Sequence, residues 1–156
     1  MEYYYTSYHK VHNAYSCGGV RIDGKNLLCC SWHNGYKQEW DSTVYFKEIG
    51  KYCDCWNPPE EIKKKWDENC VYAAYDFLYA IQKFFRLKIG EALISENMLV
   101  RMFAILDKRV GKRTLKKLAE TGTGDMEDLP DWLRSFYLLR LEAEVIRENE
   151  MTKEGE

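Results

Sequence analysis

The stretch VRIDGKNLLCCSW, residues 20–32, decides the first half of the fold. Its Asp23-Gly24 dipeptide separates two short apolar segments and tolerates the positive φ angles that a type I′ turn requires. The pattern predicts a β-hairpin whose strands cover residues 20–22 and 27–32. We expect this hairpin to be the centre of an antiparallel sheet.

The sequence on either side of the hairpin extends the sheet. Residues 3–11 are rich in aromatic and β-branched side chains and predict a third strand. Asn34-Gly35 predicts the end of the sheet region. The next segment is ambiguous, because residues 36–40 could form a helical turn and residues 44–49 a short edge strand. We therefore expect three or four antiparallel strands.

From Pro58-Pro59 onward the periodicity is helical. A proline at a helix start, followed by two glutamates, suits the fixed φ angle and the dipole of a first turn. The second expected helix is central. Its expected inward face, widened by Phe77 and Phe84, consists of Val71, Ala74, Tyr75, Leu78, Ile81 and Phe85. Gly111 predicts the end of the helix that precedes it. The expected helices cover residues 59–68, 70–86, 89–94, 96–110, 112–121 and 131–149.

These elements define an α+β fold, in which the antiparallel sheet is followed by a helical C-terminal half packed on it. A chain of 156 residues is long enough to bury a core without disulfides. We expect a single domain over residues 1–150, mainly β in 1–57 and mainly α in 58–150. Residues 151–156 are expected to form a frayed acidic tail.

The sequence shows no targeting signal. No apolar run approaches the length that crosses a bilayer, and no charged start leads into an apolar signal segment. The six cysteines are compatible with a reducing compartment, where disulfides are rare. We therefore expect a cytoplasmic protein with no membrane partner.

The net charge of −2 conceals an uneven distribution. Residues 58–120 hold thirteen Lys and Arg against nine Asp and Glu, a net of +4, whereas residues 121–156 hold four against ten, a net of −6. Within the basic part, LDKRVGKRTLKKL at 106–118 combines clustered cations with the spacing of a helix that buries one side. Such a face can neutralise phosphates, although a solvated surface helix carries similar charges. The polyanion-binding candidates are Lys108, Lys112, Arg113, Lys116 and Lys117.

Metal and catalytic sites have weaker patterns. Cys53-x-Cys55 with Cys70 would make an irregular zinc site, as would Cys29-Cys30-x-x-His33, because structural zinc usually takes two regular ligand pairs. A catalytic Cys–His arrangement is formally possible on the sheet, but the sequence fixes no nucleophile, base and orienting group together. We therefore expect no catalytic residue, no metal site and no cofactor.

Five short segments carry a resemblance to other proteins. They are RIDGK at 21–25, YDF at 75–77, IGEAL at 89–93, LDKRVGKRTLKKL at 106–118 and FYLLRLEAE at 136–144. In these segments the chain resembles a family of small uncharacterised bacterial proteins with no assigned function. The resemblance implies a sheet followed by helices, in agreement with the periodicity.

The resemblance also offers a structural interpretation of the basic segment. Asp107, Arg109, Arg140 and Glu144 all lie in the resembling segments, and the last two are spaced i, i+4 on one expected helix. These four residues could form an ion-pair network that ties two helices together, with the bidentate geometry that arginine and carboxylate favour. The network and a binding face are compatible.

The sequence therefore predicts a binding protein, rather than an enzyme, that contacts nucleic acid or another polyanion through the basic helix at 112–121. The alternative is a protein–protein interaction or self-association module with no nucleic-acid role. Salt dependence separates the two, because polyanion binding weakens steeply as the salt concentration rises.

Overall fold

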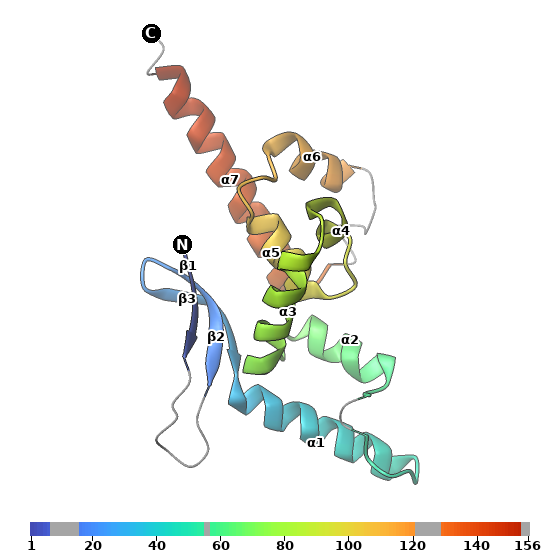
Figure 1. Ribbon diagram of the computed structural model, residues 1–156. Coiled ribbons are helices and arrows are strands. Elements are labelled where there is room, and N and C mark those ends of the chain that lie inside the picture. Colours follow the sequence, from blue (N-terminus) through green and yellow to red (C-terminus); the bar gives the residue numbers. More distant parts are fainter. Residues whose placement is uncertain (7–15, 55–56, 121–128, 154–156) are drawn as a thin grey trace. The chain divides into compact units, whose positions relative to one another are not determined.

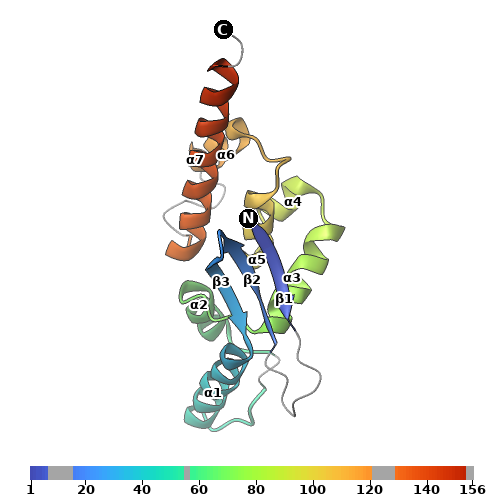
Figure 2. The same cartoon turned by 90° about the vertical axis from the view of Figure 1, so that its left-hand side faces the viewer.

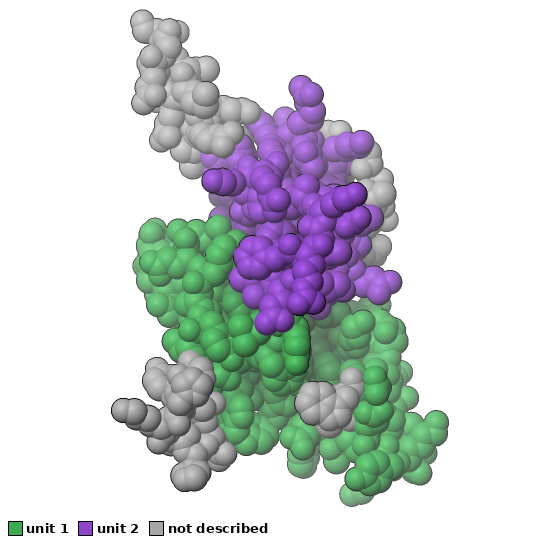
Figure 3. Space-filling model, viewed as in Figure 1, with its two compact units in different colours: residues 1–79 green, residues 80–156 purple. Residues whose placement is uncertain are grey.

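A computed structural model describes residues 1–6, 16–54, 57–120 and 129–153 of the chain. The described residues form an N-terminal antiparallel sheet followed by helices, which confirms the predicted α+β class. The chain divides into two compact units, Met1–Tyr79 and Ala80–Glu156 (Figure 3). The expectation of a single domain over residues 1–150 stays a prediction.

The sheet has three strands, β1 (Glu2–Thr6), β2 (Cys17–Ile22) and β3 (Lys25–Ser31), with β2 in the middle (Figures 1 and 2). At the β2–β3 turn, Asp23 has a φ angle of 48° and Gly24 one of 77°. Positive φ angles at both central residues are the requirement of a type I′ turn, so the predicted hairpin is confirmed. The rest of the strand predicted at 3–11 lies outside the described residues.

One helix, α1 (Trp32–Glu48), follows β3 directly, so the predicted edge strand at 44–49 is wrong. The helix begins here because the Ser31 side chain accepts a hydrogen bond from a backbone N–H of the first turn. Its buried residues are the polar Gln38 and Ser42, while its aromatic side chains are exposed or half-buried. Because the buried residues of this helix are polar, the periodicity of its apolar residues does not indicate a helix.

The next two helices are α2 (Glu60–Glu68) and α3 (Ala74–Arg86). α2 begins directly after Pro59, close to the predicted start. α3 begins later than the predicted residue 70, because Cys70 has a φ angle of 54°. A left-handed residue interrupts a helix, so Cys70 belongs to the connection between α2 and α3.

The buried face of α3 differs from the predicted one. Phe85 is 76% exposed, and Tyr75 is also exposed. Ala74, Phe77 and Phe84 are buried as predicted, and Ala80 is buried with them. Phe77, Ala80 and Phe84 have the i, i+3, i+7 spacing of a single helical stripe. Because aromatic residues occupy several arcs of this helix, their positions do not identify the inward face.

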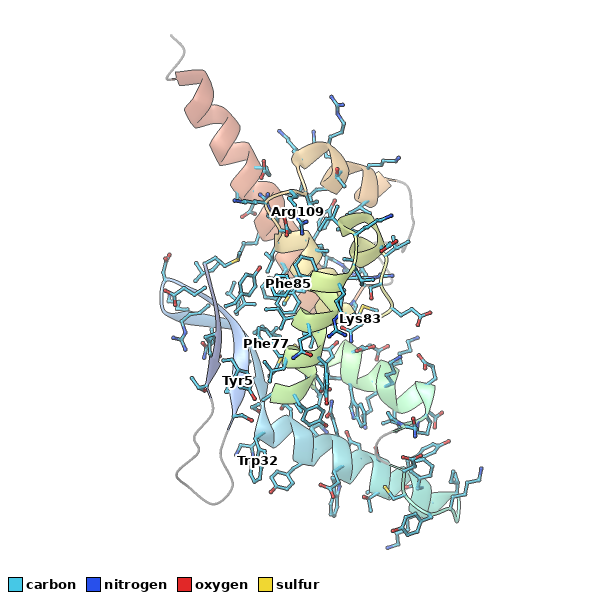
Figure 4. All side chains as sticks on the ribbon, viewed as in Figure 1. Tyr5, Trp32, Phe77, Lys83, Phe85 and Arg109 are labelled. Atoms are coloured by element: carbon cyan, nitrogen blue, oxygen red, sulfur yellow. The ribbon has the colours of Figure 1, made fainter. Side chains whose placement is uncertain are left out.

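Phe77 packs against the backbone of β2 within the first unit (Figure 4). A Cβ atom added at Gly18 would lie 2.7 Å from the Phe77 ring and 3.1 Å from the Tyr5 ring. Val20 and Leu28, on the same face of the sheet as Gly18, are buried. The glycine is therefore the residue that lets the start of α3 approach the sheet.

The second unit contains the end of α3 and the helices α4 (Ile89–Leu93), α5 (Met98–Leu106), α6 (Lys112–Glu120) and α7 (Asp131–Lys153). α5 is buried along most of its length and contacts α4 and α7. It is shorter than the predicted 96–110, because Asp107 is extended and caps its end. Gly111 therefore does not end this helix, and α7 extends beyond the predicted 131–149.

The contact at Gly18 leads to a stability prediction. We expect Gly18→Ala to lower the free energy of unfolding by about 1–3 kcal/mol, because the added methyl group meets the Phe77 ring. The matched control is Gly90→Ala, where an added Cβ meets nothing within 4 Å; it should be neutral or stabilising by up to about 1 kcal/mol. Denaturant unfolding followed by circular dichroism measures both. Equal effects of the two substitutions would show that the approach at Gly18 is unimportant.

Candidate polyanion-binding surface

An ion pair organises the turn between α5 and α6. The Arg109 side chain donates to both Asp107 oxygens, with Nε 2.9 Å from Oδ1 and Nη2 2.8 Å from Oδ2. The Arg109 backbone N–H adds a hydrogen bond of 2.8 Å to Oδ1. The hydrogen bonds from the Arg109 side chain lower the pKa of the Asp107 carboxyl group. This arginine is therefore engaged locally, although its side chain is 60% exposed.

A second ion pair lies in α7 and contacts the same turn. Arg140 pairs with Glu144, which is only 3% exposed. The Arg140 Nη2 atom also donates to the Val110 carbonyl oxygen at 3.2 Å. Val110 is itself buried and lies directly before α6. α7 thus holds the backbone from which the basic helix begins.

The four residues that the sequence suggested as a network occur as two ion pairs, Asp107–Arg109 in the turn and Arg140–Glu144 in α7. The Val110 carbonyl connects the second pair to the turn. Bidentate geometry fixes the conformation of the turn, and the buried pair fixes where the turn lies on α7.

α6 buries one side and exposes its cations. Leu115 is fully buried, and α6 contacts α7. Side chains with nitrogen tips extend outward from this helix (Figure 4). Lys112 is half-buried, whereas the other candidates are exposed. We call the following set the basic surface: Lys108, Lys112, Arg113, Lys116 and Lys117.

The cations of the basic surface differ in their present contacts. Lys112 and Lys117 take part in other interactions within the structure. Within the described parts of the chain, Lys108, Arg113 and Lys116 have no ion-pair partner. Among the described residues, the charges of these three side chains are therefore left to be neutralised by longer-range interactions, solvent or a ligand.

The first turn of α6 has an unusual charge. It contains no acidic residue, and Lys112 and Arg113 occupy it instead. Acidic side chains normally stabilise this end of a helix by about 0.3–1 kcal/mol each, and cations have the opposite effect. An anion bound here would interact favourably with the helix dipole and with both side chains.

The first unit contains a polar cluster around the buried Gln38 that sequence analysis missed. The Gln38 amide nitrogen donates to the Val71 carbonyl at 3.0 Å and to the Asp76 carboxylate at 2.9 Å. The Tyr75 hydroxyl donates to the Gln38 side-chain oxygen at 3.0 Å, and the Ala73 N–H donates to Asp76 at 2.8 Å. Burial raises the pKa of the Asp76 carboxyl group, and the two hydrogen bonds that it accepts oppose this shift.

A neighbouring contact extends this cluster. The Tyr72 hydroxyl donates to the Asp67 carboxylate at 2.7 Å, and burial raises the pKa of the Asp67 carboxyl group. The Trp66 indole N–H donates to Asp41 on α1 at 3.0 Å. These carboxylates act as acceptors that join α1, α2 and the start of α3. Asp76, in the first turn of α3, was the one member of this cluster that the sequence could have indicated. Its partner Gln38 is 38 residues away in the chain, so local spacing does not reveal their hydrogen bond.

The cysteines and histidines give no metal site in the described parts of the chain, where no group of three metal-ligating side chains is found. Cys55, His9 and His12 lie outside the described residues. The expected absence of a metal and of a cofactor therefore stays a prediction.

The fold and the site define a small α+β protein with a basic helix held on a helical unit. The model of the SF0329 protein family matches residues 1–141, and the chain belongs to this family. The family is uncharacterised. Neither the curated proteins nor the solved structures include a match to the chain. Over the described residues, no helix has the length and apolar character needed to cross a membrane.

The two ion pairs differ in burial, which leads to a second prediction. Arg140→Met should lower the free energy of unfolding by about 3–5 kcal/mol, because the buried Glu144 carboxylate loses its guanidinium partner. Arg109→Met, in the exposed pair, should have a much smaller effect. The double variant Arg140→Met/Glu144→Leu should recover most of the loss. Denaturant unfolding that gave equal losses for the two single variants would contradict this account.

Proposed function

We propose that the chain is a binding protein that contacts nucleic acid, or a polyanion of similar charge density, through the basic surface. The observation that carries the proposal is the charge of α6, whose first turn holds two cations and no acid. Cations at this end of a helix interact unfavourably with the helix dipole. A phosphate backbone is a ligand that would compensate for it.

The dimensions of α6 suit such a ligand. Lys112 and Lys117 are five positions apart, a rise of about 7.5 Å along the helix axis. Duplex DNA presents about four phosphate charges over that length. Lys112–Lys116 and Arg113–Lys117 are also i, i+4 pairs of like charge, which repel each other by about 0.2–0.5 kcal/mol per pair. Bound phosphates would offset this repulsion, because each cation would be attracted to a negative charge.

The proposal involves binding and no catalysis, in the cytoplasm. The half-buried carboxylates of the first unit, Asp67 and Asp76, already accept hydrogen bonds from neighbouring groups. Cys30 is a buried free thiol, which is compatible with a reducing compartment.

The test is the salt dependence of binding to short duplex DNA, single-stranded DNA and RNA. We expect log K to fall with log salt concentration with a slope of about −4 for duplex DNA, as neutralisation of four or five phosphates requires. The variant Arg113→Gln/Lys116→Gln should bind more weakly and reduce the slope by about 2. Fluorescence anisotropy over a range of salt concentrations measures both quantities.

The matched control is Lys63→Gln/Lys64→Gln on α2, which removes the same charge from another exposed helix. It should leave the affinity and the slope nearly unchanged, and circular dichroism checks that both variants fold. Absence of binding by the wild type at low salt overturns the proposal. Equal losses in the two variants would assign binding to net charge rather than to the basic surface.

The second candidate function is self-association through α1. Tyr36, Trp40 and Val44 form an exposed apolar stripe at i, i+4, i+8 on this helix, and Trp40 is 70% exposed. Large exposed aromatic residues on one helical stripe are typical of contact surfaces. Such a contact would persist at high salt, so the salt series above separates it from polyanion binding.

A further inference from the structure

Two cysteines meet on one face of the sheet. In the β2–β3 register, Cys17 lies opposite Ser31 and Cys29 lies opposite Gly19. Residues two positions apart on a strand share a face, so Cys17 and Cys29 are diagonal neighbours on the same face. Gly19 has no side chain between them. The two thiols therefore approach each other without an intervening group.

The distance between the two sulfur atoms is short. Cys17 Sγ lies 2.8 Å from Cys29 Sγ, and both residues are free cysteines. This separation is within an ångström of the about 2.0 Å length of a disulfide bond. Little movement of the β2–β3 ladder is needed to bring the sulfurs to bonding distance.

The two thiols differ in their access to solvent. Cys29 is exposed, whereas Cys17 is half-buried. The Tyr4 hydroxyl lies 3.7 Å from Cys17 Sγ. Burial and the hydrogen bond with Cys29 raise the pKa of the Cys17 thiol to about 11. Because Cys29 is exposed, it is the thiol that a dissolved oxidant reaches first.

The neighbouring Cys30 differs from this pair. It follows Cys29 in β3 and so points to the opposite face of the sheet. There it is fully buried, and burial raises the pKa of its thiol strongly. Of the two adjacent cysteines, only Cys29 combines solvent access with a nearby second thiol.

We propose that Cys17 and Cys29 form a dithiol site that hydrogen peroxide oxidises reversibly to an intramolecular disulfide. In the first step, the Cys29 thiolate attacks one peroxide oxygen, the O–O bond breaks, and the hydroxide that leaves takes up a proton to become water. Cys29 is then a sulfenic acid.

In the second step, the Cys17 sulfur attacks the Cys29 sulfur and the S–OH bond breaks. The leaving hydroxide takes the Cys17 proton and becomes a second water. Two thiols and one peroxide thus give one disulfide and two waters, and each sulfur is oxidised by one electron. A small-molecule thiol reverses the reaction by thiol–disulfide exchange. The dithiol site lies on the β2–β3 hairpin of the first unit, and the inference does not rest on the proposed function of the basic surface.

The test treats the reduced full-length protein with hydrogen peroxide and maps its peptides under non-reducing conditions. We expect a peptide pair linked through Cys17 and Cys29 in a monomeric chain, with the two cysteines losing alkylation in equal proportion. Dithiothreitol should restore both thiols. Cys17→Ser should instead accumulate oxidised Cys29 without the link, and Cys29→Ser should leave Cys17 as a thiol.

Cys53→Ser provides the matched control, because Cys53 is a free thiol outside the sheet; this variant should form the same link as the wild type. Three results would overturn the proposal. The first is oxidation of Cys29 while Cys17 stays alkylatable in the wild type. The second is a link between two chains rather than within one. The third is no change at either cysteine under peroxide that fully oxidises a free cysteine peptide.

Discussion

The basic helix depends on one guanidinium group that is largely withdrawn from solvent. Burying a charge is costly unless another charge and further hydrogen bonds compensate for it. Arg140 has two such partners. One is the Glu144 carboxylate on the same helix, and the other is the carbonyl oxygen of Val110, which precedes α6 in the chain. The second contact ties α7 to the chain at the point where the basic surface begins. Together with the buried Leu115, it defines which side of α6 faces solvent.

The first unit uses buried polar groups in the same way. Gln38 on α1 joins the Asp76 carboxylate and the Val71 carbonyl, and thereby connects α1 to the start of α3. Each partner lies far along the chain from Gln38, so the contact forms only when the correct tertiary arrangement has formed. Apolar packing, such as that of Phe77 on Gly18, brings the elements together. The polar contacts then select one geometry among those that packing allows.

Sequence motifs of a few residues predicted the elements whose conformation depends on residues that are neighbours in the chain. Asp23-Gly24 predicted the hairpin because a type I′ turn requires those residue types. Of α1, only a possible helical turn at 36–40 was predicted, because the buried residues of this helix include Gln38, which is polar. The cations of α6 were evident from the sequence, but the shorter α5 was not, because its end depends on the side chain of Asp107. The Cys17–Cys29 approach needed the strand register, which sequence alone leaves open.

The most direct test of the central claim is hydrogen–deuterium exchange of the α6 backbone amides in Arg140→Met. If Arg140 holds the start of α6 on α7, the amides of residues 112–118 should lose more protection than those of α5, which lose only what the lower global stability costs. Arg134→Met, which removes the same charge near the start of α7, should leave α6 unchanged. Unaltered protection of α6 in Arg140→Met would contradict the account, because the basic helix would then be held by its apolar side alone.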